Sequence, residues 1–225
     1  MCGRYHQAAP AERLGREFDL DIRDNFPARY NICPTQPVSV ICMNEKRRRA
    51  YRLMRWGFIP SFAKKELLDK LAVRPLINAR ADGVETRPSF RNAFRRRRCL
   101  VPATGFYEWK GAAGAKQPYN IIRADGEIAA FAGLWETAHD RDGGEIETVA
   151  IITTDAGPDL RDLHDREPVV IRRDAYEFWL ATDERDAAMT SSLLIAQKAG
   201  FWRFFAVSKA VNSTRNDGPE LVAPI

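Results

Sequence analysis

Short runs of β-branched, aromatic and aliphatic residues recur along this chain, and turn-forming residues separate them. Residues 37–43 (PVSVICM) and 49–59 (RAYRLMRWGFI) are two such runs, with the polar residues 44–48 (NEKRR) between them. Residues of these types favour strands, and a short polar segment between two strands favours a hairpin. The pattern therefore predicts a hairpin over 37–59.

The same pattern continues through the second half of the chain, and it predicts strands over 99–109, 119–124, 127–136, 146–154 and 167–171. Asp125 and Gly126 lie between the second and third of these runs, and an Asp-Gly pair favours the tight turn of a hairpin. The run at 146–154 is dense in β-branched residues. We expect the run at 167–171 to be a short buried strand.

We expect helices over the segments 8–18, 87–97, 174–181 and 183–199, and the last two carry apolar positions at helical period. Many strands, few helices and no regular alternation of the two favour an α+β fold. We predict a curved, barrel-like, mostly antiparallel sheet with peripheral helices. No internal repeat or Pro/Gly-rich linker divides the sequence, so we expect a single domain over 1–225.

The composition indicates a globular chain, because 45% of the 225 residues are hydrophobic and five are tryptophan. No apolar run approaches the roughly 18 residues of a membrane span, and no signal-peptide pattern opens the chain. We expect no membrane partner, and a cytoplasmic, nucleoid-associated protein. The cysteines (Cys2, Cys33, Cys42 and Cys99) form no CxxC pair, so no metal and no cofactor are expected.

The charge is mildly basic, with 35 Lys and Arg against 30 Asp and Glu. This balance is compatible with a polyanionic partner. Arginines cluster at 47–49 and 95–98. Charge runs usually form solvated faces, and the second cluster also follows a helical segment, whose C-terminus favours cations.

The second residue of the chain is a cysteine, in the sequence MCGRY. If Met1 is removed, Cys2 carries a free α-amine beside its thiol, and these groups titrate at about 7.7–8.0 and about 8.5. Two nucleophiles would then lie on adjacent carbons. The alternative is that Cys2 is a small hydrophobic residue of the core.

Three further segments carry candidate chemistry. Asn78 and Arg80 would lie on one face of an extended segment, where an amide and a guanidinium suit a phosphate or a sugar, although an ordinary loop is equally compatible. Glu108 lies among aromatic residues; strand alternation by itself favours exposure, whereas desolvation would raise its pKa and make it a general acid/base. His164 precedes a strand and suits proton transfer, unless it is structural or merely exposed.

Ten segments occur together in an order and spacing that resemble the SRAP family, the SOS response-associated peptidases or abasic-site processing proteins. They are 1–5 (MCGRY), 29–36 (RYNICPTQ), 55–62 (RWGFIPSF), 76–82 (LINARAD), 105–110 (GFYEWK), 117–126 (QPYNIIRADG), 131–136 (FAGLWE), 153–156 (TTDA), 163–171 (LHDREPVVI) and 207–222 (VSKAVNSTRNDGPELV). The resemblance covers essentially the whole chain.

The resemblance implies that Met1 is lost and that Cys2 reacts with the aldehyde of an abasic site in single-stranded DNA. The amine forms an imine, and the thiol closes a thiazolidine ring that shields the lesion. Asn78 would hold the cysteine amine or the sugar oxygen, Glu108 would act as general acid/base, and His164 would move protons. We expect a monomer, with replication-fork association as a further expectation.

The resemblance also implies a path for the DNA backbone, lined by Arg4, Asn31, Arg80, Thr153, Arg166 and Ser208. Phosphate contacts of this kind give affinity without sequence preference. Phe62 is the one aromatic residue in a segment where relatives carry adjacent tryptophans, and Lys64 and Lys65 would compensate by charge. Glu167 departs from the family pattern, and would weaken phosphate binding or tune His164.

Three other functions are compatible with parts of this sequence. An N-terminal-nucleophile amidohydrolase also begins MCG, but Arg4 and Tyr5 stand here where that class usually has an aliphatic residue and a glycine. A non-catalytic module binding single-stranded DNA would use the arginines and aromatic residues alone. A peptidase activity would be limited to self-removal of Met1 or of a short leader.

Overall fold

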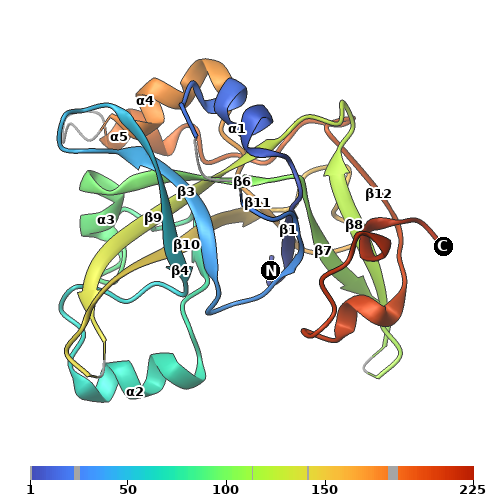
Figure 1. Ribbon diagram of the computed structural model, residues 1–225, viewed down its shortest axis with the longest axis horizontal. Helices are drawn as coiled ribbons and strands as arrows, with labels where there is room; N and C mark the ends of the chain where they lie inside the picture. Colours follow the sequence, from blue (N-terminus) through green and yellow to red (C-terminus); the bar gives the residue numbers. More distant parts are fainter. Residues whose placement is uncertain (1, 23–25, 113, 141, 182–186) are drawn as a thin grey trace.

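Five strands of the computed structural model close into a barrel, which confirms the predicted barrel-like sheet (Figure 1). The structure describes residues 2–22, 26–112, 114–140, 142–181 and 187–225. The barrel strands are β3 (Pro37–Met43), β4 (Arg49–Trp56), β6 (Arg98–Ala103), β9 (Ala129–His139) and β10 (Glu145–Asp155). Neighbours around the barrel are antiparallel, except that β10 runs parallel to β4. The hairpin predicted over 37–59 is formed by β3 and β4.

β10 extends beyond the barrel and carries two short strands on its second half. β5 (Asn78–Arg80) pairs with it in parallel, and β11 (Arg166–Pro168) pairs with it antiparallel. The run predicted as a strand at 167–171 thus begins in β11, and its later part touches the barrel through a single bridge between Phe131 and Val170. The extension brings segments far apart in the sequence to one place.

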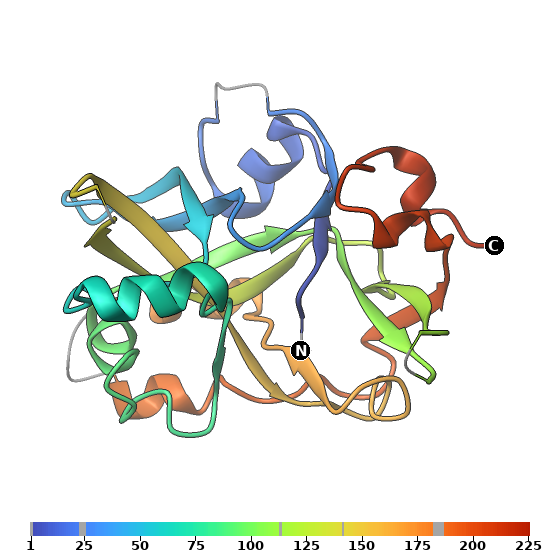
Figure 2. The ribbon, with the colours of Figure 1, turned by 90° about the horizontal axis from the view of Figure 1, so that it is seen from below.

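A second sheet lies beside the barrel (Figure 1). Its strands, in spatial order, are β12 (Trp202–Ala206), β8 (Gln117–Arg123), β7 (Gly105–Lys110), β1 (Tyr5–Gln7) and β2 (Arg29–Ile32), all antiparallel to their neighbours. The N-terminus lies between this sheet and the barrel, as both Figure 1 and Figure 2 show. Cys2 therefore begins the chain at the junction of the two sheets.

The helices lie around the strands, as predicted (Figure 2). They are α1 (Ala11–Phe18), α2 (Lys65–Val73), α3 (Arg91–Arg96), α4 (Tyr176–Leu180), α5 (Ala187–Ser191) and the 3₁₀ turns η1 (Arg173–Ala175), η3 (Lys209–Asn212) and η4 (Pro219–Val222). α1 buries Leu14 and Phe18, which are four residues apart and share a face. Of the helices in the described part of the chain, none is long and apolar enough to cross a membrane.

Two sequence predictions about strands are wrong. The run 99–109 is not one strand: it divides at Thr104 into β6 of the barrel and β7 of the second sheet. Asp125 and Gly126 do form a turn, but the strands on either side, β8 and β9, belong to different sheets. Both errors have one cause, because strand runs and turn residues do not say which strand will be the neighbour.

The helix predictions were too long at two places and missed one helix. Only 91–96 of the segment 87–97 is α-helical, and residues 187–191 are the helical part of the described residues in 183–199. Residues 183–186 lie outside the described part of the chain. α2 was not predicted, although Leu67, Leu68 and Leu71 follow its helical period and face Ile59 and Ile146.

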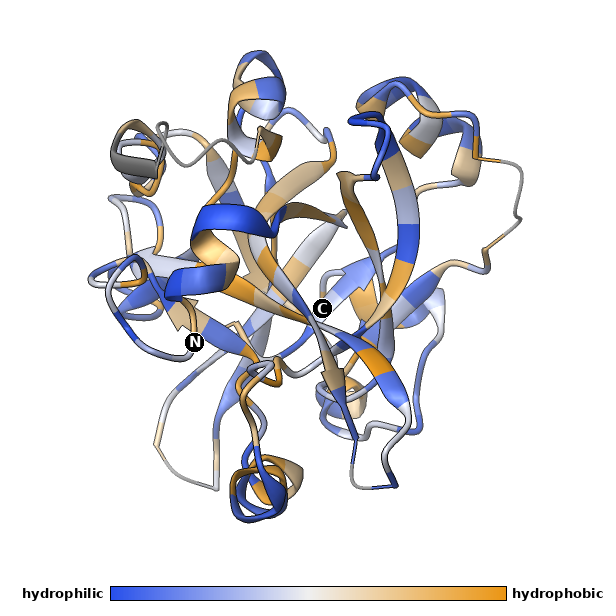
Figure 3. Cartoon of the chain, turned by 90° about the vertical axis from the view of Figure 1, so that its left-hand side faces the viewer, coloured by the Kyte–Doolittle hydropathy of each residue, from blue (hydrophilic) through white to orange (hydrophobic). Residues whose placement is uncertain are grey.

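The barrel and the space between the two sheets hold the apolar core. Figure 3 shows the hydrophobic residues concentrated on the strands in the middle of the molecule. One large cluster packs the barrel against α1, α3 and α4, and another joins the barrel to the second sheet and includes Cys2 and Tyr5. The alternative that Cys2 is a buried residue is thus correct as a description of its surroundings.

The cluster 95–98 is not a solvated face throughout, because Arg98 is buried. Its guanidinium donates to the carbonyl oxygens of Trp179 (2.7 Å), Phe94 (2.7 Å) and Ala181. It also lies over the rings of Phe94 and Trp179. Arg98 therefore ties α3 and α4 to the barrel, whereas Arg95 and Arg96 are exposed.

We predict that Arg98→Met lowers the free energy of unfolding by about 2–4 kcal/mol, because it leaves several buried carbonyl oxygens without donors. Arg95→Met is the matched control in the same cluster, and we expect it to change stability by less than about 0.5 kcal/mol. Urea unfolding of both variants measures the difference. Equal effects of the two substitutions would contradict the structural role of Arg98.

Candidate functional site

Cys2 is buried where β1 passes between β2 and β7. β1 pairs with both strands, and the backbone N–H of Tyr107 donates to the carbonyl of Arg4 (3.0 Å). The side chain of Cys2 has no exposed surface. Pairing on both sides of β1 thus holds the start of the chain in the junction between the two sheets.

Asn78 reaches Cys2 from β5. Its Nδ2 donates to the backbone carbonyl of Cys2 (2.9 Å), and the pairing of Asn78 with Ile151 of β10 fixes its backbone. The prediction that Asn78 and Arg80 lie in an extended segment is confirmed. The buried Oδ1 of Asn78 accepts no hydrogen bond among the described residues, which leaves a polar atom for a ligand.

Glu108 points into the same junction from β7. Its side chain is only 7% exposed, so the exposure that strand alternation favoured is wrong. Burial raises the pKa of the carboxyl to about 7. Near neutral pH the carboxyl is therefore partly protonated, and can both give and take a proton.

His164 approaches Glu108 from the loop that precedes β11. Its Nε2 lies 3.7 Å from Oε2 of Glu108, while its Nδ1 lies 3.0 Å from the backbone nitrogen of Arg166 and 2.9 Å from Oδ1 of Asp165. When Nδ1 accepts from Arg166, the proton of the neutral ring is on Nε2, facing Glu108. The charged ring donates from Nδ1 to Asp165 instead.

Burial shifts the pKa values of the two groups in opposite directions: it lowers that of His164 and raises that of Glu108. An ordinary Glu carboxyl is a stronger acid than His by about 2 units. Glu108 is therefore no longer the much stronger acid of this pair.

The thiol of Cys2 is protonated at neutral pH. Burial, together with the charge of Glu108, raises its pKa far above the usual range. A thiol of this kind does not attack as a free thiolate, so it must lose its proton as it reacts. Glu108 is the nearby base.

Arg4 and Asn31, predicted as DNA contacts, are hydrogen-bonded to each other, and Arg4 is half-buried. Nη1 of Arg4 donates to Oδ1 of Asn31 (2.7 Å) and to the carbonyl of Val211 (2.9 Å). Asn31 is buried, and its Nδ2 donates to the carbonyls of Ser213 and Asn216. Both side chains therefore hold the C-terminal segment against β1 and β2. Ser208 caps η3, where its hydroxyl accepts from the backbone of Ala210 (3.2 Å).

Arg80, Thr153 and Arg166 lie together at the extension of β10. Thr153 is buried, and Nη2 of Arg166 donates to its carbonyl (2.6 Å) and to its hydroxyl (3.1 Å). The guanidinium of Arg166 is only 6% exposed, whereas that of Arg80 is 52% exposed. Of these three side chains, Arg80 is thus the one that reaches solvent.

Carboxylates that sequence reasoning missed surround these arginines. Asp82 accepts from Nε of Arg80 (2.8 Å), and Asp155 lies 3.2 Å from Nη1 of Arg166. Asp165 is the partner of His164 described above. The signal was present, because Asp82 and Asp165 adjoin residues that the sequence analysis singled out.

Phe62 and Glu167 lie at opposite extremes of exposure. Phe62 is 54% exposed and precedes α2, beside the exposed Lys64 and Lys65. Glu167 is fully buried, and its carboxylate accepts from the backbone of Gly157 (2.9 Å) and Gln197 (2.6 Å). Glu167 therefore faces no phosphate path, and instead ties two loops to β11.

No group of three or more His, Cys, Asp or Glu side chains able to hold a metal ion occurs among the described residues. The chemistry derived above uses only side chains of this chain.

Comparisons with known proteins agree over nearly the full length. The model of the SRAP family, described as SOS response associated peptidase, matches residues 1–214. The abasic site processing protein YoaM of Bacillus subtilis is 34% identical over 226 residues, covering 99% of this chain and 97% of its own. The abasic site processing protein YedK of Escherichia coli is 30% identical over 234 residues, covering both chains completely.

A solved structure of a Bacteroides thetaiotaomicron protein has the same fold. It superposes with a TM-score of 0.85 and covers all of both chains at 24% identity.

We predict that Glu108→Gln stabilises the protein by about 2–3 kcal/mol at about pH 8 and has little effect at about pH 4. A carboxyl with a pKa of about 7 when folded and 4.5 when unfolded binds more protons in the folded state between these values. The free energy of unfolding therefore falls as pH rises through this window, and the cost is complete above it. Urea titrations at the two pH values measure the effect.

The matched control is Glu66→Gln, because the carboxylate of Glu66 is 86% exposed. We expect it to change stability by less than about 0.5 kcal/mol at either pH. A pH-independent effect of Glu108→Gln would show that the buried carboxyl is not the titrating group.

Proposed function

The chain belongs to the SRAP family, as its sequence motifs indicated, and from this membership we propose that it processes abasic sites by capturing their aldehyde in single-stranded DNA through Cys2. The observation that carries the proposal is the convergence of Cys2, Asn78, Glu108 and His164. They come from the segment before β1, from β5, from β7 and from the loop before β11. Two relatives of matching length are named abasic site processing proteins.

Removal of Met1 is the first step. Water hydrolyses the peptide bond between Met1 and Cys2, and it leaves a free amine on Cys2 beside the thiol. Glu108 and His164 are the acid/base groups of the Cys2 cluster, and the hydrogen bond from Asn78 to the Cys2 carbonyl holds Cys2 in place. This self-removal is the extent of peptidase activity that we propose.

The amine then attacks C1′ of the ring-opened abasic site. A carbon–nitrogen bond forms, and Glu108 relays the two protons of the amine to the aldehyde oxygen. The carbon–oxygen bond breaks, water leaves, and an imine remains. His164 assists the preceding opening of the sugar, because the proton on its Nε2 can pass to or from Glu108. The partial protonation of Glu108 near neutral pH suits this double role.

The thiol closes the ring. Its sulfur adds to the imine carbon, its proton passes to Glu108, and the imine electron pair moves to nitrogen, which takes a proton. One water is released for each thiazolidine that is formed from the amine, the thiol and the aldehyde. Because the ring consumes the imine, cleavage of the strand by β-elimination is suppressed.

Some side chains around this cluster contact the DNA, and others hold the strands and loops in position. Arg80 is exposed beside Asn78 and can meet a phosphate, and Phe62 can contact a base. Arg4, Asn31, Thr153, Arg166 and Ser208 act by positioning the strands and loops that form the path. As part of the same proposal, the protein acts as a monomer. It acts in the cytoplasm on nucleoid DNA, and at replication forks.

We predict that the protein, once mass spectrometry confirms loss of Met1, forms a complex with single-stranded DNA carrying one abasic site that survives heat and detergent. A denaturing gel detects the complex as a shifted band. We expect no band with undamaged DNA, and none with Cys2→Ala. Cys33→Ala is the matched control, because it removes another buried thiol and leaves Cys2 in place.

Each alternative function gives a different result. A non-catalytic binding module would retain DNA in native gels, but would show no heat-resistant band. An N-terminal-nucleophile amidohydrolase would show no band and would release ammonia from an amide substrate through Cys2. A band that persists with Cys2→Ala would place the nucleophile elsewhere and overturn the proposal.

A further inference from the structure

The two arginine clusters of the sequence, 47–49 and 95–98, come together in the folded chain. A cavity of about 300 Å³ is lined by Asn44 and Arg47 from the turn between β3 and β4, by Arg96 and Arg98 from the end of α3 and the start of β6, and by residues of β9 and α4. A larger hollow of about 820 Å³ adjoins it and shares Asn44, Arg47 and Glu177. The site around Cys2 uses none of these residues.

The guanidinium groups around these hollows are not equivalent. Arg98 binds backbone carbonyls, and Arg49 is paired with Glu177 and with the carbonyl of Phe18. Both are structural. In contrast, Arg47 and Arg48 are exposed, and no ion pair within the described residues engages either of them. Two guanidinium groups are thus left for a ligand.

The backbone of the turn is held in one conformation. Oδ1 of Asn44 accepts from the backbone nitrogens of Lys46 and Arg48 (both 3.0 Å), and the backbones of Asn44 and Arg48 are also bonded to each other (2.9 Å). Arg47 adopts a left-handed conformation with φ of 54°. A turn fixed in this way presents its arginines with little loss of backbone entropy on binding.

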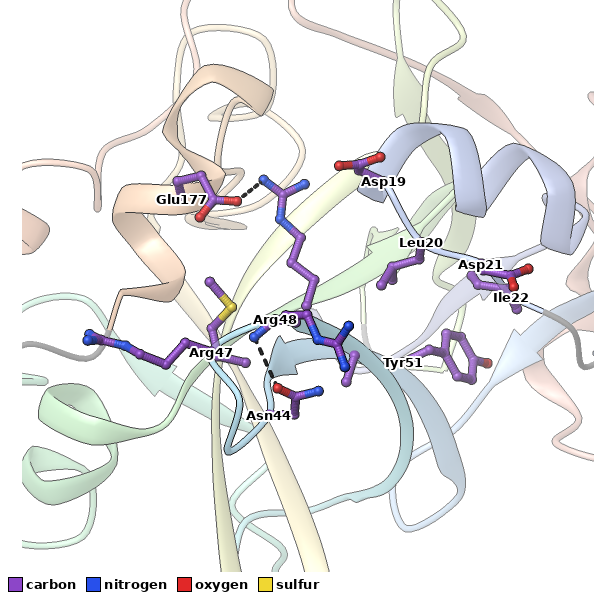
Figure 4. A pocket seen from close by; sticks show the side chains of 12 residues that line it. Asp19, Leu20, Asp21, Ile22, Asn44, Arg47, Arg48, Tyr51 and Glu177 are labelled. Carbon is purple, nitrogen blue, oxygen red and sulfur yellow. Dashed lines mark hydrogen bonds and ion pairs between the residues drawn. The ribbon is translucent and has the colours of Figure 1, made fainter.

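The charges are distributed unevenly around the turn. Asp19, Asp21 and Arg48 line only the larger hollow, whereas Glu177 lines both hollows and its carboxylate is paired with Arg49. Figure 4 shows Arg47 extending from the turn away from Asp19 and Asp21. The smaller cavity, which Arg47 and Arg96 both line, is therefore the more cationic of the two.

We infer that Arg47, Arg48 and Arg96 form a second phosphate-binding surface, which holds the backbone of undamaged nucleic acid apart from the Cys2 site. Arginine forks suit phosphate oxygens, and contacts of this kind need no particular base. In Figure 1 the turn lies near α4 and α5, away from the N-terminus at the junction of the sheets. The surface would add affinity for long strands, independently of the reaction at the lesion.

The arginines beside the ring of Trp135 disfavour stacking of a nucleobase on it at this surface. Arg52 and Arg97 each lie 5.7 Å from the centre of its ring. These guanidinium groups compete with a nucleobase for the aromatic faces. We therefore expect binding without base preference.

The test compares two triple variants by fluorescence anisotropy with undamaged DNA of about 30 nucleotides, at several salt concentrations. One variant is Arg47→Gln, Arg48→Gln, Arg96→Gln. The control is Arg172→Gln, Lys198→Gln, Arg203→Gln, which removes three exposed charges elsewhere. We expect the first variant to bind about 10-fold to 100-fold more weakly at low salt, and its salt slope to fall by about 2.

Three further measurements separate this inference from the proposed function. Crosslinking to an abasic oligonucleotide of about 6 nucleotides should be unchanged in the first variant, because so short a strand needs only the Cys2 site. Single-stranded and duplex probes of one sequence show which backbone the surface prefers. Weaker binding of either probe by the first variant than by the parent protein supports the inference. Affinity and salt slope equal to the parent protein's for both probes, or an equal loss in the control variant, would overturn it.

Discussion

The double pairing of β10 is the constraint on which the rest of this structure depends. Its first half closes the barrel against β9 and β4, and its second half leaves the barrel and pairs with β5 and β11. One strand thus belongs to the core and also supports the site. Because backbone hydrogen bonds fix β5 and β11 on either side of it, Asn78 and the loop carrying His164 are placed with the rigidity of a sheet rather than that of free loops.

Burial sets the acidity of the groups in the site. Cys2 and Glu108 lie where the two sheets meet, and the same desolvation that makes the thiol a poor acid brings the carboxyl close to neutrality. Burial therefore disfavours a spontaneous thiolate while it creates the base that can remove the proton. Keeping a carboxyl in this environment costs stability, and the surrounding apolar packing of Tyr5, Phe106 and their neighbours offsets that cost.

Arginine serves two purposes in this protein, and the difference is one of position. Arg98 and Arg166 are buried, and their guanidinium groups donate to backbone carbonyls of neighbouring elements. Arg47, Arg48 and Arg80 reach solvent from short turns or strands. The buried arginines hold the elements together, Arg80 is paired with Asp82, and Arg47 and Arg48 are left for anionic ligands.

The sequence by itself determined most strands of the barrel, the hairpin over 37–59, the fold class and the candidate residues that gather around Cys2, because hydrophobic period and short motifs are local properties. It did not reveal β1, β2 or β12, and it left β5 open between an extended segment and a loop. It could not decide the neighbours of the strands, so 99–109 was taken as one strand and Asp125-Gly126 as the turn of a hairpin. Nor could it distinguish a buried from an exposed polar side chain, as Glu108, Asn31, Arg98 and Glu167 show. Only the tertiary structure decided these points, because burial and pairing depend on contacts between segments far apart in the chain.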